Sequence, residues 1–156
     1  MITDPSILEF AEHYSTPQSE VLRKLERDTH LHVINANMLS GHIQGLFLEM
    51  ISTMVKPERI LEIGTYTAYG TICLSKGLVP DGFIHTIESN EELEEKIRNY
   101  LRKAGISEKT ILHIGEAREV IPMLDEAFDL VFIDASKHQY IEYYDLVFDK
   151  VKQGGY

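Results

Sequence analysis

The sequence is poor in cysteine and in basic residues, and it has no long apolar run. Its single cysteine, Cys73, excludes an internal disulfide and any zinc site built from several cysteines. Lys and Arg number 15 against 25 Asp and Glu, and this charge of −10 disfavours nucleic acid and membranes as partners because both are anionic. No apolar stretch has the length of a membrane span, and the first residues lack the basic and apolar segments of a secretory leader. We therefore expect a reduced, cytoplasmic protein.

The rest of the composition is that of one folded domain. The chain has 156 residues, of which 44% are apolar and 26% charged, as in globular proteins. The first 35 residues have helical spacing. Asp4–Pro5 and Thr16–Pro17 are the expected helix starts there, because each places a capping residue before proline. A more buried helix is expected over residues 42–55, and Pro57 would end it.

Beyond Pro57, apolar strands and amphipathic helices alternate. Strands are expected at residues 59–64, 83–88, 110–114 and 128–133, and helices at residues 68–77, 90–104, 116–124 and 138–152. Repeated strand–helix–strand units imply right-handed crossovers and a parallel sheet with helices on both faces. Strands that are apolar nearly throughout agree with burial on both sides. We predict one α/β domain with a doubly wound, mostly parallel sheet and N-terminal helices.

A polar residue or a glycine turn follows each expected strand where it ends. The four segments are Glu62–Gly70, Glu88–Asn90, Gly115–Ala117 and Asp134–Lys137. Ligands of such sheets bind outside the carboxyl ends of the strands, which all lie along one edge. We therefore expect the four segments to form one binding site.

The segment after the first strand is unlike the common phosphate-binding loops. No glycine lies between Gly64 and Gly70, and the lysine of a P-loop is missing. Glu62 disfavours a pyrophosphate and suits a cationic group, although a glutamate in a surface turn is the plainer alternative. Glu88 is placed to accept hydrogen bonds from two ribose hydroxyls, or else to cap the next helix. Together these residues describe a nucleoside with a positive, unphosphorylated end, and S-adenosylmethionine fits that description.

Asp134 and Lys137 are the candidates for the reaction itself. A carboxylate at a strand end can bind Mg²⁺, with Mn²⁺ or Ca²⁺ as alternatives, because hard cations prefer oxygen ligands. A lysine near a metal and a cationic ligand loses preference for its ammonium form and can then act as a general base. Taken alone, Asp134 is equally well explained as a helix cap, and Lys137 as a solvated lysine at a helix start.

The segment from Met38 to Tyr140 resembles the cation-dependent class I O-methyltransferases of the catechol and caffeoyl-coenzyme A type. The stretches that carry the resemblance are Met38–Ser40 with Gly45 downstream, Glu62–Tyr69, Glu88, Gly115–Ala117 and Val131–Lys137. The resemblance implies a Rossmann-like methyltransferase domain over residues 38–156, preceded by an N-terminal helical extension over residues 1–37. It also implies methyl transfer from S-adenosylmethionine to a hydroxyl of a catechol-like aromatic acceptor.

The resemblance further assigns roles to single residues. Asp134 would be the first metal ligand and a cofactor neighbour, and Lys137 the general base. Glu88, with Ser89 beside it, would bind the ribose. The adenine would lie against Gly115, Glu116 and Ala117, and the methionine side of the cofactor against Met38, Ser40, Glu62, Gly64, Tyr66 and Gly70.

Three features depart from the family pattern. Ser136 stands where many plant members have aspartate. Gly70 stands where a serine often contacts the cofactor, so that polar contact is expected either to be absent or to be supplied by Thr71. In the family, the glycines corresponding to Gly154–Gly155 open a fifth strand that ends in Asp-Asn, the remaining metal ligands. The given sequence is therefore expected to lack the C-terminal strands of the family sheet.

Two other functions are compatible with the sequence. One is a nicotinamide-dependent oxidoreductase on a related sheet, which needs a glycine-rich pyrophosphate turn that the Glu62 segment does not supply. The other is a non-catalytic module that binds S-adenosylmethionine. Tyr66, Tyr69 and Tyr140 are candidates for an aromatic acceptor pocket or for packing. The amphipathic N-terminal helices favour a homodimer.

Overall fold

A computed structural model describes residues 4–156 and places seven α-helices and four strands in that part of the chain. Helices α1 (Pro5–His13), α2 (Glu20–His32) and α3 (Gly41–Val55) come first. The alternating part then runs through β1 (Arg59–Ile63), α4 (Tyr69–Leu74), β2 (Phe83–Glu88), α5 (Glu94–Lys103), β3 (Thr110–Ile114), α6 (Ala117–Met123), β4 (Leu130–Ile133) and α7 (Tyr140–Phe148). Within residues 4–156, none of the helices combines the length and the hydropathy needed to cross a membrane.

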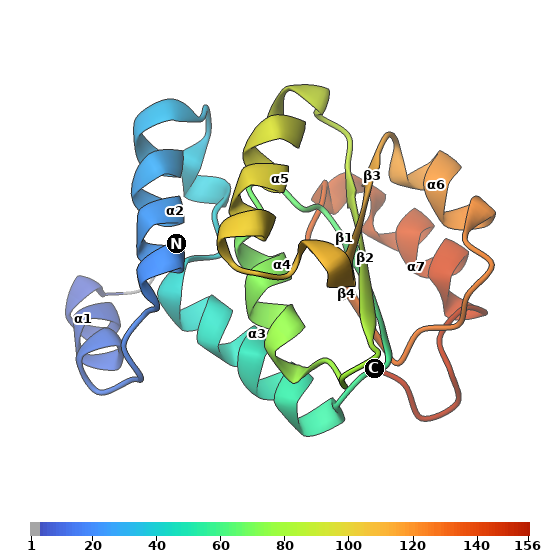
Figure 1. The fold of residues 1–156 in the computed structure, drawn as a ribbon, viewed down its shortest axis with the longest axis horizontal. Coiled ribbons are helices and arrows are strands. Elements are labelled where there is room, and N and C mark those ends of the chain that lie inside the picture. Colours follow the sequence, from blue (N-terminus) through green and yellow to red (C-terminus); the bar gives the residue numbers. More distant parts are fainter. Residues whose placement is uncertain (1–3) are drawn as a thin grey trace.

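The four strands form one parallel sheet in the order β3-β2-β1-β4. The chain moves outward from β1 to β3 and then returns to place β4 on the other side of β1. Helices α4 and α5 lie on one face of the sheet, and α6 and α7 cover the other (Figure 1). The predicted doubly wound α/β fold is therefore confirmed, and its topological switch point lies between β1 and β4.

Alternate residues of the inner strands enter two separate cores. Ile60 of β1 and Ile84 of β2 belong to the cluster formed with α2, α3 and α4. Leu61 and Ile87 belong to the cluster formed with α6 and α7. All four side chains are at most 2% exposed, and burying a side chain of this size stabilises the fold by roughly 1.5–3 kcal/mol. The sheet is thus fixed from both faces, which holds the strand ends in place.

The two expected starts of the N-terminal helices have different outcomes. Asp4 caps α1 and accepts a hydrogen bond from the backbone N–H of Ser6 at 2.9 Å, as predicted. The start at Thr16–Pro17 is wrong, because α2 begins at Glu20 with Ser19 as its cap. Tertiary contacts hold the preceding residues outside the helix: the Thr16 carbonyl lies 2.8 Å from His42 Nε2, and Gln18 donates to the Tyr69 hydroxyl at 2.6 Å.

The last helix also ends earlier than predicted. Helix α7 stops at Phe148 instead of residue 152. Beyond it, Val151 forms an isolated parallel bridge with Phe128, and the Tyr156 N–H donates to the Asp129 carbonyl at 3.0 Å. The Lys152 N–H donates to the Phe128 carbonyl at 2.9 Å, and the Lys150 carbonyl accepts from the Phe128 N–H at 2.7 Å, so these groups are satisfied without a further helical turn.

Asp129 joins this C-terminal segment to the start of β1. Its Oδ2 accepts the backbone N–H groups of Glu58 and Arg59 at 2.9 and 2.8 Å, and its Oδ1 lies 2.8 Å from Lys152 Nζ. Burial raises the pKa of Asp129, but the hydrogen bonds from Lys152 and from the two backbone N–H groups lower it by more. The pKa of Asp129 therefore lies below its ordinary value. Its stabilising effect is therefore present at neutral pH and is lost as the pH falls through that lowered pKa.

We expect Asp129→Ala to lower the free energy of unfolding at pH 7 by about 1–3 kcal/mol, because two N–H groups lose their acceptor. Asp125→Ala, at an exposed position of the same loop, is the matched control and should stay within about 0.5 kcal/mol of the original protein. Urea unfolding at pH 7 and in acid measures both. The difference for Asp129→Ala should shrink in acid, and equal losses in the two variants would contradict the assignment.

Candidate functional site

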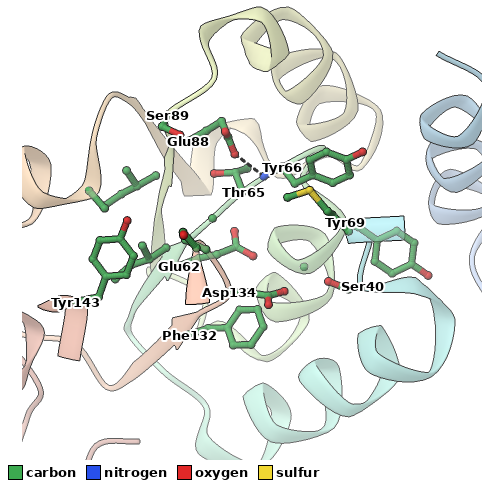
Figure 2. Close-up of a pocket in the computed structure, with 18 of the residues that line it drawn as sticks. Ser40, Glu62, Thr65, Tyr66, Tyr69, Glu88, Ser89, Phe132, Asp134 and Tyr143 are labelled. Carbon is green, nitrogen blue, oxygen red and sulfur yellow. Dashed lines mark hydrogen bonds between the residues drawn. The ribbon is translucent and has the colours of Figure 1, made fainter. Parts of the chain in front are cut away.

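A cavity of about 390 Å³ lies at the switch point, beyond the carboxyl ends of β1, β2 and β4. This volume lies within the range of about 300–1,000 Å³ that is usual for small-molecule sites. In Figure 2, Glu62, Glu88 and Asp134 come from neighbouring strand ends around one hollow, with Tyr66 and Tyr143 on opposite sides of it. The convergence expected from the sequence is therefore present.

Most of the residues singled out in the sequence line this cavity. Those that do are Met38, Ser40, Glu62, Gly64, Tyr66, Gly70, Glu88, Ser89, Gly115, Glu116, Ala117 and Asp134.

Thr71 and Lys137 are absent from the cavity wall. Thr71 is fully buried, and its hydroxyl donates to Glu62. Of the two alternatives for the contact at position 70, this placement disfavours the one in which Thr71 supplies it. Lys137 is exposed in the short 3-10 turn Lys137–Gln139.

The structure adds lining residues that the sequence reasoning missed. They include Leu39, Thr65, Ile87, Phe132 and Tyr143. Phe132 could have been found, because it lies two residues before Asp134 and strand side chains alternate with a period of two. Tyr143 had no such signal, since its place depends on how α7 packs over the sheet. Of the candidate acceptor tyrosines, Tyr66 and Tyr69 line the cavity and Tyr140 does not.

The turn after β1 has an unusual backbone. Gly64, Tyr66 and Ala68 have φ angles of 102°, 51° and 75°. Such angles cost residues with a Cβ roughly 1–2 kcal/mol each, so surrounding contacts must hold them. The Gly64 N–H donates to the Ile87 carbonyl at 3.0 Å, and the Tyr66 N–H donates to Glu88 Oε2 at 2.7 Å. The turn is therefore fixed to β2 beside the cavity (Figure 2).

Glu62 is a buried carboxyl group at the centre of the site. Its side chain is 1% exposed, and Oε2 accepts hydrogen bonds from the hydroxyls of Thr71 and Thr86, the latter at 2.6 Å. Burial, together with repulsion from Asp134 and Glu88, raises the pKa of Glu62 to about 7 even though both hydroxyls counteract this. A positive group in the cavity would stabilise its ionised form.

Glu88 and Asp134 add to the negative character of the cavity. Burial raises the pKa of Glu88 despite backbone hydrogen bonds that favour the ionised form, among them those from Asn90 and Tyr66 at 2.9 and 2.7 Å. Burial also raises the pKa of Asp134, against the opposing effects of Gln44 and Lys137. Within the described chain, the residues that line the cavity include no Lys, Arg or His. The site therefore favours a cationic ligand and disfavours a pyrophosphate.

The structure supports a metal site less fully than it supports a site for a cationic ligand. Among residues 4–156, no group of three or more His, Cys, Asp or Glu side chains is arranged to hold a metal ion. In the described part of the chain, the carboxylate of Asp134 has one hydrogen bond, a long one of 3.5 Å from Gln44 Nε2 to Oδ2, so it can contribute one oxygen ligand.

Comparison with known proteins decides the family. A family model described as O-methyltransferase matches residues 12–156.

The chain belongs to the O-methyltransferase family. This confirms the resemblance found in the sequence.

Two curated members of the O-methyltransferase family illustrate the match. Caffeoyl-CoA O-methyltransferase 1 of Arabidopsis thaliana is 32% identical over 158 residues, which cover 96% of this chain and 59% of the relative. Caffeoyl-CoA O-methyltransferase 5 of Nicotiana tabacum is 31% identical over 155 residues, covering 96% and 63%. The chain thus spans about three fifths of the length of these relatives.

Solved structures of O-methyltransferases share the fold. TomG from Streptomyces achromogenes, solved in complex with SAM, has a TM-score of 0.89 at 28% identity, with 96% of this chain and 69% of TomG covered. PaMTH1 from Podospora anserina, solved with SAH bound, has a TM-score of 0.90 at 26% identity, covering 96% and 65%.

Proposed function

We propose that this chain binds S-adenosylmethionine in the acidic cavity and supplies the cofactor-binding part of an O-methyltransferase. The observation that carries the proposal is the convergence of three carboxyl groups with raised pKa on a cavity whose lining, among the described residues, has no basic side chain. The sulfonium and ammonium groups of this cofactor are the positive charges that such a cavity would favour. The SAM and SAH complexes of structurally similar methyltransferases support the same ligand.

Residues at different strand ends bind different parts of the cofactor. Glu62, with Gly64 and Gly70 beside it, accepts hydrogen bonds from the ammonium group at the methionine end of the cofactor. Glu88 binds the ribose hydroxyls, because each carboxylate oxygen has lone pairs beyond the one used by a backbone N–H. The adenine lies against Gly115–Ala117. Met38 and Ser40 close the methionine side of the pocket.

The reaction proposed for this site is methyl transfer to a hydroxyl of a hydroxylated aromatic small molecule. When bound, the cofactor would supply an electrophilic methyl group, and breaking the bond from sulfur to this methyl group would leave S-adenosylhomocysteine. Lys137, on the turn that follows Asp134, removes the proton of the acceptor hydroxyl, and Asp134 contributes one ligand to a divalent cation. Positioning of the two reactants can contribute roughly 7–11 kcal/mol to such a bimolecular step. The cytoplasmic location and the homodimer stay predictions.

Titration calorimetry tests the cofactor class. We expect S-adenosylhomocysteine and S-adenosylmethionine to bind with one site per chain, and NAD to give no heat, because its pyrophosphate would meet the carboxyl groups of Glu62 and Glu88. Binding of NAD with no response to S-adenosylhomocysteine would instead support the oxidoreductase alternative.

A mass assay for methylated catechols tests the reaction, with Mg²⁺ and with EDTA. Product that depends on Mg²⁺ supports metal-assisted methyl transfer by this chain. Cofactor binding without any product would support the non-catalytic binding module and contradict the proposed reaction.

A further inference from the structure

Three buried threonines surround the inner side of the Glu62 carboxyl group. Thr65, Thr71 and Thr86 are at most 3% exposed. Thr86 donates to Glu62 Oε2 at 2.6 Å, Thr71 donates to the same oxygen, and the hydroxyls of Thr65 and Thr86 lie 2.5 Å apart. Because Thr86 has a single hydroxyl proton and directs it to Glu62, Thr65 must donate to Thr86. All these hydroxyl protons therefore point, directly or in relay, toward one oxygen.

The other carboxyl oxygen, Oε1, faces Gly70. A Cβ at position 70 would lie only 2.6 Å from Oε1, so glycine there leaves the space in front of this oxygen open. Both Glu62 and Gly70 line the cavity, whereas Thr71 and Thr86 do not. The threonines thus hold Oε2 on the protein side and leave Oε1 as the acceptor that can reach a ligand.

The terminal torsion of a glutamate is intrinsically broad, so an unrestrained carboxyl group would sample many orientations. Two hydroxyl donors on one oxygen remove that freedom before the ligand arrives. An acceptor that is already oriented avoids the cost of ordering during binding.

We propose that Thr71, together with Thr86, is a positioning residue that aims Glu62 Oε1 at the ammonium group of the cofactor. The inference rests on the proposed function, because it assumes that the methionine end of the cofactor lies at Glu62. Thr71 acts through Glu62 and has no contact with the ligand of its own. Its contribution is therefore confined to ligands that carry the ammonium group.

Calorimetry with two ligands separates this role from a purely structural one. S-adenosylhomocysteine carries the ammonium group, and 5′-methylthioadenosine has the same nucleoside without the amino-acid end. We expect Thr71→Val to weaken the affinity for S-adenosylhomocysteine about 10-fold or more, which corresponds to the loss of one hydrogen bond to a charged group. Affinity for 5′-methylthioadenosine should change less than about twofold, and Thr71→Ser should restore most of the loss because it returns the hydroxyl.

Thr67→Val is the matched control. Thr67 is equally buried, in the turn that precedes α4, but its hydroxyl accepts a hydrogen bond from that of Thr29 at 3.1 Å instead of bonding to Glu62. Both affinities should be unchanged in this variant. Thermal unfolding verifies that each variant is folded.

The outcomes distinguish the positioning role from the proposed function. If the original protein binds neither ligand, the proposed function fails. A second outcome is that the original protein binds both ligands while Thr71→Val lowers the two affinities equally or leaves both unchanged. In either case the positioning role is wrong and the proposed function stands. If Thr71→Val does not fold, Thr71→Ala also lacks the hydroxyl and takes its place, and the same results for its two affinities would support or overturn the positioning role.

Discussion

Glu62→Gln is expected to weaken S-adenosylhomocysteine binding by roughly 100-fold, because truncating a buried charged hydrogen bond to a ligand costs about 2–5 kcal/mol. Glutamine keeps the shape of the side chain and an oxygen that can accept from Thr71 and Thr86. It lacks the negative charge that would face the ammonium group. The measurement is calorimetry with S-adenosylhomocysteine and 5′-methylthioadenosine. Loss of affinity for the first ligand alone supports the assignment, and unchanged affinity for both would contradict it.

The same substitution should stabilise the free protein at alkaline pH. The pKa of Glu62 is raised by burial from an ordinary 4.5 to about 7, so the folded state binds a proton that the unfolded state has lost. Stability from this group is complete below pH 4.5 and is lost as the pH rises through 7. Above that pH the ionised group costs at most about 3 kcal/mol, because a tenfold change in proton affinity corresponds to about 1.4 kcal/mol. Glutamine cannot ionise and avoids this cost.

Urea unfolding at pH 4.5 and pH 8 compares the two proteins. The variant should match the original protein in acid and exceed it by up to about 3 kcal/mol at pH 8. His85 and His113 also titrate, with pKa values lowered by burial, but both proteins contain them and their effect cancels in the difference. A variant that is less stable than the original protein at pH 8 would show that the Glu62 charge is already compensated in the free protein.

The site was predictable where its residues lie at the carboxyl end of a strand or directly after it. Glu62, Glu88 and Asp134 stand at the ends of apolar runs, and parallel strands bring their carboxyl ends to one edge of the sheet. Their shared cavity follows from that topology. The repulsion between them also follows, because nearby carboxyl groups disfavour each other's ionisation.

Residues on the helices were harder to place. Thr71 follows Gly70 in sequence, but it lies in the first turn of α4, and its hydroxyl turns back toward β1 instead of the cavity. Tyr143 reaches the cavity from α7 across the opposite face of the sheet. Such placements depend on the distance and rotation between a helix and the sheet, which the periodicity of one segment does not contain. The early end of α7 has a similar origin, because pairing beside β4 is a contact distant in sequence.

Gly64→Ala is expected to separate the ends of the two strands that frame the site. The φ of Gly64 is 102°, and a Cβ there would lie 2.6 Å from the Asp134 carbonyl oxygen and 3.0 Å from the Ala135 nitrogen. These atoms are backbone, so they can move only if β1 and β4 part. We expect a loss of about 2–5 kcal/mol in the free energy of unfolding, the sum of an unfavourable φ and overpacking. S-adenosylhomocysteine binding should fall by at least about 10-fold, since a displacement of 1 Å at a site is costly.

Gly105→Ala measures the backbone part of this effect without the steric part. Gly105 also has a left-handed φ, 71°, but a Cβ there would meet no atom within 4 Å. This variant should lose only about 1–2 kcal/mol from the strained backbone and should bind S-adenosylhomocysteine normally. Urea unfolding and calorimetry on both variants give the comparison. Because the two substitutions share the backbone penalty, the additional loss at Gly64 measures how much the close approach of β1 and β4 matters. Equal losses of stability and affinity would mean that the strand ends yield without disturbing the site.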